Sequence, residues 1–573
     1  MLIRAIALIR RLACLAFAGV FCLAAQEAQP EIVKRTDYAQ AIATSRAILQ
    51  QEIARTSTPG LAIAIVDRDQ VVWAEGFGSS GSVLPFTPGT LSSMQSISKH
   101  YTALAFLRLA ERGLISLDDP ITKCVPEFTV RSRTPVDYNA ITFRRLLSHW
   151  AGFQHEAPIG NNMDPYSPSF DAHIRSISDT WLRFPPGDRF AYSNLGVDLA
   201  GYALQRLTGK PFPQVVREEV FEPLGMRSST FDDVAAVSSP SFATGHWGSA
   251  PAAHTPIPIV PSGGMYSTVL DMAKCISMHL ANGVIGGPAN SRRAFRQTTF
   301  LHPETLAEMY RPQFQPDGQV VGYGLGTGRL LGRGAPIVFH SGGGFGYVSM
   351  QLWIPEYGLG VAVLANTNNF DTGNTPVLAL QEFVRTKLGT LPPWDSVAAG
   401  LPVVDVPASQ LQALTGTYKG RAGVLTFSLS GAHLQLSSEV YGYQTLNAHS
   451  PLVFSEMREH PNMWTFHVDA SGRGVSVTVL GDETYVLNDR AGDPKGPNSS
   501  DWSGIPGRYG VQAPWGPWEW QVDRHNGYLY TYNNGAPVKL TEFQSHVFSE
   551  PDGIVWEFNG HDAVIEGVQC TRR

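Results

Sequence analysis

The sequence predicts an α+β chain in which a region of helices and strands is followed by two small antiparallel β-barrels. Helical and strand-like patterns alternate over residues 30–390, whereas only strand-like patterns follow. The Pro-rich stretch from Gly389 to Pro407 separates the two regions and is typical of a linker. We therefore expect domains at residues 30–390, 408–490 and 502–573.

Length and composition agree with several domains and exclude some functions. A chain of 573 residues is too long for one compact core, because domains usually hold about 100–200 residues. Its charged fraction of 16% argues against a disordered chain. A net charge of −6 excludes a strongly basic surface, so we expect no nucleic-acid partner. Only nine residues are lysines, which makes the setting of each one informative.

The first 25 residues have the features of a signal peptide. Arg4, Arg10 and Arg11 form a basic start, and a short apolar stretch from Leu12 to Ala25 follows. That stretch is too short for a comfortable membrane span. We expect residues 1–25 to be cleaved, and the rest of the chain to be secreted or periplasmic without a membrane partner. An uncleaved anchor is the alternative.

Within residues 30–390, strand-like segments lie at both ends and helices lie between them. A helical pattern over residues 37–56 comes first, and residues 96–280 are mostly helical. The predicted strands are residues 61–66, 71–76, 348–353 and 358–365. We expect one sheet assembled from both ends of this region and covered by helices.

An internal repeat predicts that the two C-terminal domains are alike. Three short motifs occur twice in the same order, roughly 90 residues apart. The pairs are Gly416-Thr-Tyr418 with Gly507-Arg-Tyr509, Val453-Phe-Ser-Glu456 with Val547-Phe-Ser-Glu550, and Trp464-Thr-Phe466 with Trp556-Glu-Phe558. Hairpin signals at Ser430-Gly431, Asn526-Gly527 and Asn534-Gly535 favour antiparallel barrels or sandwiches.

The last domain also contains a cluster of aromatic residues: Trp515, Trp518, Trp520, Tyr528, Tyr530 and Tyr532. Such a cluster can bind a sugar or peptide. We favour packing on one face of a small barrel.

The strongest chemical signal is Ser96-Ile-Ser-Lys99, which is followed by an apolar helical pattern. Residues three positions apart share one helix face, so the Ser96 hydroxyl would lie near the Lys99 amine. At a helix N-terminus the dipole would also stabilise an oxyanion. A serine needs a base to become a nucleophile, and a buried lysine can be that base. An N-capping serine beside a solvated lysine is the structural alternative.

Two further motifs complete a candidate catalytic set. Tyr192-Ser-Asn194 supplies a phenol that can relay a proton and an amide that can bind a substrate carbonyl and hold Lys99. His340-Ser-Gly-Gly-Gly344 comes before a strand-like segment, and glycine N–H groups there can form an oxyanion hole. Read singly, either motif would be an ordinary loop.

Together, the order Ser-x-x-Lys, Tyr-x-Asn and basic residue-x-Gly resembles the serine penicillin-recognising enzymes. The Tyr-x-Asn form resembles the branch of class C β-lactamases, D-aminopeptidases, D-alanyl-D-alanine carboxypeptidases and family VIII carboxylesterases. Five flanking segments also resemble family landmarks: Pro59–Val66, Gly113–Pro120, Leu146–His149, Glu222–Met226 and Gly263–Ser267. The resemblance covers residues 35–370. It implies a β-lactamase/transpeptidase-like antiparallel sheet flanked by helices, with a helical subdomain. The barrels resemble the lipocalin-like C-terminal modules of some D-aminopeptidases.

The resemblance implies a two-step acyl transfer that needs no cofactor. Ser96 would attack a carbonyl, Lys99 and Tyr192 would move its proton, and Asn194 would orient the substrate. The backbone N–H groups of Ser96 and Gly343 would bind the oxyanion.

His340 departs from typical β-lactamases, which carry lysine at this position. With an ordinary pKa of about 6.5, a histidine is only partly charged and holds a carboxylate less firmly. We therefore expect a peptidase, amidase or esterase that acts on small D-amino-acid-like or ester substrates, with cell-wall peptide among the candidates. A β-lactamase or D-alanyl-D-alanine carboxypeptidase is the first alternative.

Two other classes of protein remain open. One is a penicillin-binding sensor that acylates without turnover, and the other is a cell-wall-binding protein whose barrels carry the function. A metalloenzyme lacks support, because the 16 histidines are scattered and His-Glu-x-x-His is absent. After the leader, Cys124, Cys275 and Cys570 fit no metal pattern, and we treat them as structural.

Overall fold

A computed structural model describes residues 36–573, apart from residues 82–83, 164–168, 287–297, 315–321, 333–334, 393–401, 421–422, 440–441, 457–462, 480–482, 490–498, 526 and 534–535. The predicted signal peptide, Asn526 and Asn534-Gly535 therefore lie outside the described residues. Residues 40–573 form one compact unit. In the described part of the chain, no helix is long and apolar enough to cross a membrane.

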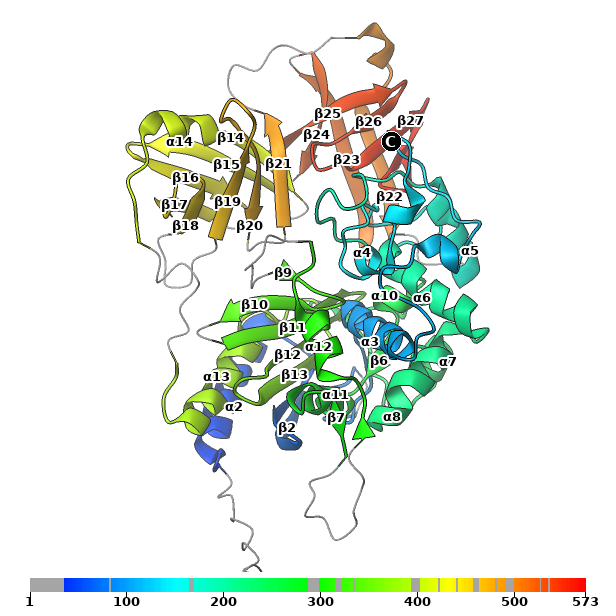
Figure 1. The fold of residues 1–573 in the computed structure, drawn as a ribbon, viewed down its shortest axis with the longest axis vertical. Coiled ribbons are helices and arrows are strands. Elements are labelled where there is room, and N and C mark those ends of the chain that lie inside the picture. Colours follow the sequence, from blue (N-terminus) through cyan, green and yellow to red (C-terminus); the bar gives the residue numbers. More distant parts are fainter. Residues whose placement is uncertain are drawn as a thin grey trace, which may run out of the picture. The chain divides into compact units, whose positions relative to one another are not determined.

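A seven-stranded antiparallel sheet forms the centre of the first region, with strand order β2-β1-β13-β12-β11-β10-β9 (Figure 1). The strands are β1 Gly60–Asp67, β2 Gln70–Gly78, β9 Gly322–Tyr323, β10 Gly328–Gly332, β11 Ala335–Gly344, β12 Tyr347–Ile354 and β13 Leu359–Ala365. Leu61 of β1 lies opposite Ala365 of β13. The two ends of the region thus meet inside one sheet, which confirms the predicted assembly.

Helices cover both faces of this sheet. The side chains of Ala62, Ala64 and Val66 join the large core formed with α3 and α11. On the opposite face, Trp73 of β2 stacks against Phe383 of α13. The helices are α2 Ala39–Thr56, α3 Ser98–Glu111, α4 Phe143–Leu147, α5 Phe170–Ser176, α6 Asn194–Thr208, α7 Phe212–Val216, α8 Glu222–Leu224, α9 Asp233–Val237, α10 Val260–Gly263, α11 Val269–Leu280, α12 Pro303–Tyr310, α13 Thr375–Leu388 and α14 Ala408–Leu414.

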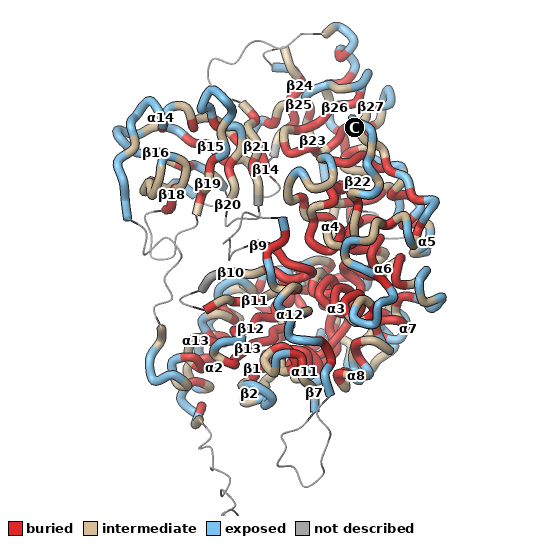
Figure 2. The backbone as a smooth tube through the Cα atoms, viewed as in Figure 1, coloured by how far each residue is buried: buried red, intermediate tan, exposed pale blue. Residues whose placement is uncertain are grey.

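The helix α3 is buried along nearly its whole length (Figure 2). Its sequence is apolar on most sides, so it packs as a central helix between the sheet and the surrounding helices rather than as a surface helix. Six short strands complete the region: β3 Ser92–Ser93, β4 His246–Trp247, β5 Ala250–Pro251, β6 Tyr266–Ser267, β7 Val284–Ile285 and β8 Thr298–Thr299.

Two closed eight-stranded barrels follow, as predicted. The first contains β14 Gly416–Gly420, β15 Gly423–Ser430, β16 His433–Ser438, β17 Gly442–Ala448, β18 Val453–Glu456, β19 Met463–Val468, β20 Gly474–Val479 and β21 Glu483–Asp489. The second contains β22 Gly507–Ala513, β23 Gly516–His525, β24 Tyr528–Asn533, β25 Ala536–Gln544, β26 Val547–Ser549, β27 Val555–Asn559, β28 Asp562–Ile565 and β29 Val568–Arg572.

The repeated motifs occupy the same places in both barrels. Tyr418 and Tyr509 lie in the first strands, and each buried hydroxyl donates to a backbone carbonyl four residues earlier, at 2.7 and 2.5 Å. Trp464 and Trp556 are fully buried in the sixth strands. The repeat therefore specifies the core of each barrel.

The aromatic cluster does not form one packed face of the second barrel, contrary to our prediction. Tyr530 is buried, but the Trp518 side chain is 46% exposed. Trp515 instead packs against Trp247 and Phe345 of the first region, with ring centroids 6.2 and 6.4 Å apart. Residues beyond the barrel, which are distant in sequence, therefore cover part of the cluster.

Candidate active site

Ser96 lies in a tight turn that opens directly into α3. Residues Gln95–Ile97 form one turn of 3₁₀ helix, and α3 begins at the next residue. Gln95 has a φ of 51°, which a non-glycine residue adopts only when its surroundings enforce it. The Gln95 side chain donates to the Ser93 hydroxyl at 2.8 Å, which helps to hold this conformation. The turn presents the Ser96 hydroxyl at the N-terminal end of the helix.

Lys99 lies beside the Ser96 hydroxyl and is itself fully buried. Its Nζ is 3.0 Å from Ser96 Oγ and donates to the Ser262 carbonyl at 2.9 Å. It also lies 4.9 Å from the centre of the Tyr192 ring, which favours a cation over the ring face. The solvated lysine of the structural alternative is thus excluded.

From the sequence we expected the Asn194 amide to hold Lys99, but it does not. Asn194 is the first residue of α6, and its Oδ1 is buried without a hydrogen-bond partner among the described residues. The single-turn helix α10 supplies the anchoring carbonyl instead, at Ser262. A short helix leaves such carbonyls without partners of its own.

Tyr192 packs between Lys99 and a histidine that belongs to none of the three motifs. The ring centroids of Tyr192 and His149 are 4.2 Å apart, and His149 Nδ1 accepts the Ser193 N–H at 3.2 Å. His149 has a φ of 65°, so the chain turns sharply after α4. The signal for this residue was present in the flanking segment Leu146–His149, but its contact with Tyr192 is visible only in the fold.

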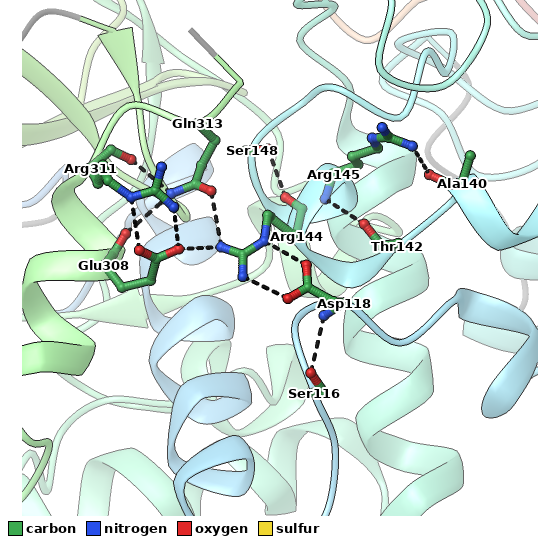
Figure 3. Close-up of polar contacts among 10 residues, drawn as sticks. All are labelled: Ser116, Asp118, Ala140, Thr142, Arg144, Arg145, Ser148, Glu308, Arg311 and Gln313. Atoms are coloured by element: carbon green, nitrogen blue, oxygen red, sulfur yellow. Dashed lines mark hydrogen bonds and ion pairs between the residues drawn. The ribbon is translucent and has the colours of Figure 1, made fainter. Parts of the chain in front are cut away.

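A network around Arg144 fixes α4, and therefore the chain that leads to His149 (Figure 3). Arg144 donates to both carboxylate oxygens of Asp118, at 2.7 and 2.9 Å, and also contacts Glu308. Its neighbour Arg145 donates to the Ala140 carbonyl at 2.7 Å. The two arginines thus tie α4 to three other segments.

His340 is a neutral, oriented imidazole. Its Nδ1 lies 2.7 Å from the Ser341 carbonyl, which can only accept, so Nδ1 carries the proton. Its Nε2 lies 2.7 Å from the Tyr323 hydroxyl, which must then donate. Burial and the nearby Lys99 charge lower the pKa of His340 to about 3. The partial charge that we expected on His340 is therefore wrong, because the ring is buried and lies near the positive charge of Lys99.

Several of the residues described above line a cavity of about 610 Å³. Its lining includes Ser96, Tyr192, His340 and Gly343, together with Thr484 of the first barrel and Asp552 of the second. Gly342 also lines the cavity, and a Cβ on it would lie 2.2 Å from the Met94 carbonyl oxygen and 2.9 Å from Ser96 N. The strand therefore packs directly on the turn of Ser96, and only glycine allows this approach.

A buried ion cluster borders the cavity. Lys419 of the first barrel lies 3.0 Å from Asp552 and 3.5 Å from Glu550 of the second barrel. Arg183 of the first region lies 3.3 Å from the same Asp552 carboxylate. All four side chains are buried. The cluster therefore links all three domains beside the cavity.

The comparisons with known proteins agree with this geometry. A family model described as Beta-lactamase matches residues 45–382. The chain belongs to the Beta-lactamase family. It is a serine hydrolase of that family, and the resemblance seen in the sequence is confirmed. The two barrels lie outside the matched residues.

The chain is similar in sequence to two named hydrolases. The chain is 28% identical over 316 residues to the D-alanyl-D-alanine-carboxypeptidase/endopeptidase AmpH of Escherichia coli (strain K12), covering 53% of this chain and 78% of AmpH. It is 28% identical over 337 residues to the unguisins hydrolase ungD' of Aspergillus campestris (strain IBT 28561), covering 56% of this chain and 60% of that hydrolase.

Solved structures show the same fold. The octameric penicillin-binding protein homologue from Pyrococcus abyssi is 24% identical, with a TM-score of 0.51. The match covers 78% of this chain and 99% of that chain, so it extends beyond the residues of the Beta-lactamase family model.

Proposed function

We propose that the chain is a secreted serine hydrolase that acts through an acyl-enzyme on small amide, D-amino-acid peptide or ester substrates. The distance of 3.0 Å between Lys99 Nζ and Ser96 Oγ carries this proposal. At that distance Lys99, together with Tyr192, can take up the hydroxyl proton while the oxygen attacks a carbonyl carbon. The cavity in front of Ser96 gives a small acyl group room to bind.

The proposed reaction has two steps. In the first, Ser96 Oγ bonds to the carbonyl carbon, and the oxyanion binds the backbone N–H groups of Ser96 and Gly343. The proton passes through Lys99 and Tyr192 to the leaving group as its bond to carbon breaks. In the second step, water gives a proton to Tyr192 and attacks the ester carbon. Tyr192 passes its own proton through Lys99 to the Ser96 oxygen as the acyl–oxygen bond breaks, which restores the Ser96 hydroxyl. No cofactor takes part in either step.

The neutral state of His340 favours substrates without a carboxylate next to the reacting bond. The imidazole has no charge to offer, and both of its nitrogens already have hydrogen-bond partners. Amides, esters and the acyl side of a D-amino-acid peptide place no such demand on the site. The similarity to AmpH and to the unguisins hydrolase supports hydrolysis as the activity, and the name of the first, a D-alanyl-D-alanine-carboxypeptidase, supports a D-amino-acid peptide as substrate.

A carboxypeptidase that recognises a terminal carboxylate is the second candidate, and Arg189 favours it. This side chain lines the cavity and is one-third exposed, although it also pairs with Asp188. A guanidinium at the cavity wall can bind a carboxylate that His340 cannot.

The test uses the wild type and Ser96→Ala with a serine-reactive fluorophosphonate. The same proteins are assayed with p-nitrophenyl esters, D-alaninamide, D-alanyl-D-alanine and a chromogenic cephalosporin. We expect labelling only in the wild type and a loss of hydrolysis of about a thousandfold or more in the variant. Labelling that survives the substitution contradicts the assignment of Ser96. Faster hydrolysis of the dipeptide than of the amide favours the carboxypeptidase.

A substitution at His340 tests its role in substrate choice. His340→Lys places a cation where this imidazole is neutral, so we expect cephalosporin hydrolysis to rise relative to ester hydrolysis. His340→Gln is the uncharged control and leaves that ratio low. An unchanged ratio in His340→Lys argues against the proposed role.

N-terminal sequencing of the exported protein tests secretion, with cleavage expected near Ala25.

A further inference from the structure

Three side chains that commonly bind transition metals meet in the core beside α3. Cys275 and His279 are four residues apart on one face of α11, and His100 lies on α3 directly after Lys99. The three donor atoms all lie within 4.8 Å of one another. His100 Nε2 is 2.9 Å from His279 Nε2 and 3.7 Å from Cys275 Sγ. The sequence alone did not reveal this cluster, because α3 and α11 are far apart along the chain.

The surroundings hold the donors in place. All three side chains are buried, with exposed fractions of 0, 1 and 2% for His100, Cys275 and His279. His279 Nδ1 lies 2.6 Å from the Tyr310 hydroxyl, and Trp353 stacks on the His279 ring at 4.4 Å. Such partners orient the ring of a metal-binding histidine.

Two of the three donor separations can be compared directly with those around a trigonal ion, and the third is no more than 4.8 Å. With bonds of about 2.1 Å to nitrogen and 2.3 Å to sulfur, the observed separation of Cys275 and His100 already fits a trigonal arrangement. In such an arrangement the two histidine nitrogens lie about 3.6 Å apart, so they would need to separate by about 0.7 Å, and two metal bonds would replace the hydrogen bond between them.

The donor set selects the metal. A soft thiolate and two imidazoles in a trigonal arrangement suit copper, whereas structural zinc sites have four protein ligands. Among the described residues, the cluster contains no fourth histidine, cysteine or carboxylate. Charge gives the same answer: Cu(I) with one thiolate is neutral, but Zn(II) would leave a net positive charge in the core, which is costly. We propose that His100, Cys275 and His279 bind a single Cu(I) ion.

Binding involves no oxidation or reduction of the protein. The Cys275 thiol releases its proton to solvent as the sulfur–copper bond forms. Each imidazole binds through the Nε2 lone pair. The ring that donates the Nε2 proton in the hydrogen bond between the two histidines must therefore shift that proton to its own Nδ1. This proposal is independent of the proposed hydrolase function.

The test is an anaerobic titration of the purified full chain with Cu(I) in the presence of bicinchoninate, a Cu(I) chelator. Protein produced in copper-supplemented medium is measured in parallel by metal analysis, since a buried site can fill slowly. We expect one copper ion per chain and a near-ultraviolet thiolate–copper absorption band. A wild type that retains no copper in either experiment overturns the proposal, and so does a wild type that retains zinc instead.

Matched cysteine variants locate the ion. Cys275→Ser is expected to lose the copper, whereas Cys570→Ser, which removes a buried thiol from the second barrel, keeps it. Tyr310→Phe removes the partner of His279 and is expected to weaken Cu(I) binding about tenfold. Copper binding that is equal in Cys275→Ser and wild type overturns the site. Circular dichroism of each variant shows whether a loss of binding reflects unfolding.

Discussion

Gly342 lies where β11 packs on the turn of Ser96, and the substitution Gly342→Ala should push the two apart. The added Cβ would lie 2.2 Å from the Met94 carbonyl oxygen and 2.9 Å from Ser96 N. Carbon and oxygen atoms in contact lie about 3.3 Å apart, so the backbone must move by about 1 Å. These two atoms belong to the backbone and cannot rotate away. The Ser349 hydroxyl, 2.6 Å from the added Cβ, is a third obstacle and donates to the same Met94 carbonyl at 2.7 Å.

This movement should reduce stability a little and activity a great deal. Overpacking of this kind costs about 1–3 kcal/mol of unfolding free energy. A displacement of about 1 Å between reacting groups costs about a hundredfold in rate. We therefore expect kcat/KM for a p-nitrophenyl ester to fall about a hundredfold, while the urea midpoint shifts modestly.

Two other glycines supply the controls. A Cβ on the exposed Gly89 would have its nearest neighbour at 3.8 Å, so Gly89→Ala should keep both activity and stability. A Cβ on Gly343 would lie 3.7 Å from Val348, so Gly343→Ala should keep the stability of the wild type. A wild-type kcat/KM in a folded Gly342→Ala protein would refute the idea that the close approach of β11 positions Ser96.

Three further predictions concern stability. Lys419→Met removes the cation that Asp552 and Glu550 share and leaves only Arg183 beside Asp552, so urea unfolding should show a loss of about 3–5 kcal/mol. Lys123→Met, in an exposed pair, should cost less than about 1 kcal/mol, and equal losses would contradict the role of burial. Arg144→Leu should cost about 1–3 kcal/mol and lower kcat, because it releases α4, whereas the exposed Arg311→Leu should have a smaller effect on both. His340 has a folded-state pKa of about 3, below its unfolded value of about 6.5, so the unfolded chain binds its proton more readily. Its contribution to stability is therefore complete above about pH 6.5 and is lost as pH falls toward 3, by at most about 1.4 kcal/mol per pH unit. Acid unfolding of His340→Gln should show a shallower dependence on pH, and an identical slope would contradict the pKa assigned to His340.

Local patterns were sufficient to predict the main elements of the fold. The short apolar run 61–66 predicted β1, because a strand buried on both faces is apolar throughout. The strand-like pattern of 348–353 predicted β12. The repeated Tyr-and-Trp motifs predicted two like domains because the same residues fill both barrel cores. Ser96 and Lys99 could be paired from their spacing alone, since one turn of helix brings them together.

Features that depend on contacts between distant segments were not predictable in this way. The carbonyl that anchors Lys99 comes from Ser262, and the hydroxyl that donates to His340 Nε2 comes from Tyr323. The low pKa of His340 follows from burial, which no short motif encodes. In each case the partner is identified by tertiary packing, and a single sequence shows neither the distance nor the degree of burial.

The pairing of Leu61 with Ala365 also has a consequence for the order of events during synthesis. The strand β1 leaves the ribosome about 300 residues before its partner β13, which at about 5–20 residues per second is about 15–60 seconds. During that time the two-stranded β1–β2 hairpin has one unpaired edge made of Leu61-Ala-Ile-Ala-Ile-Val66. Such an apolar edge can pair with other chains. The hydrolase sheet is therefore completed only after nearly all of its domain has been made, and the newly made strand needs protection until then.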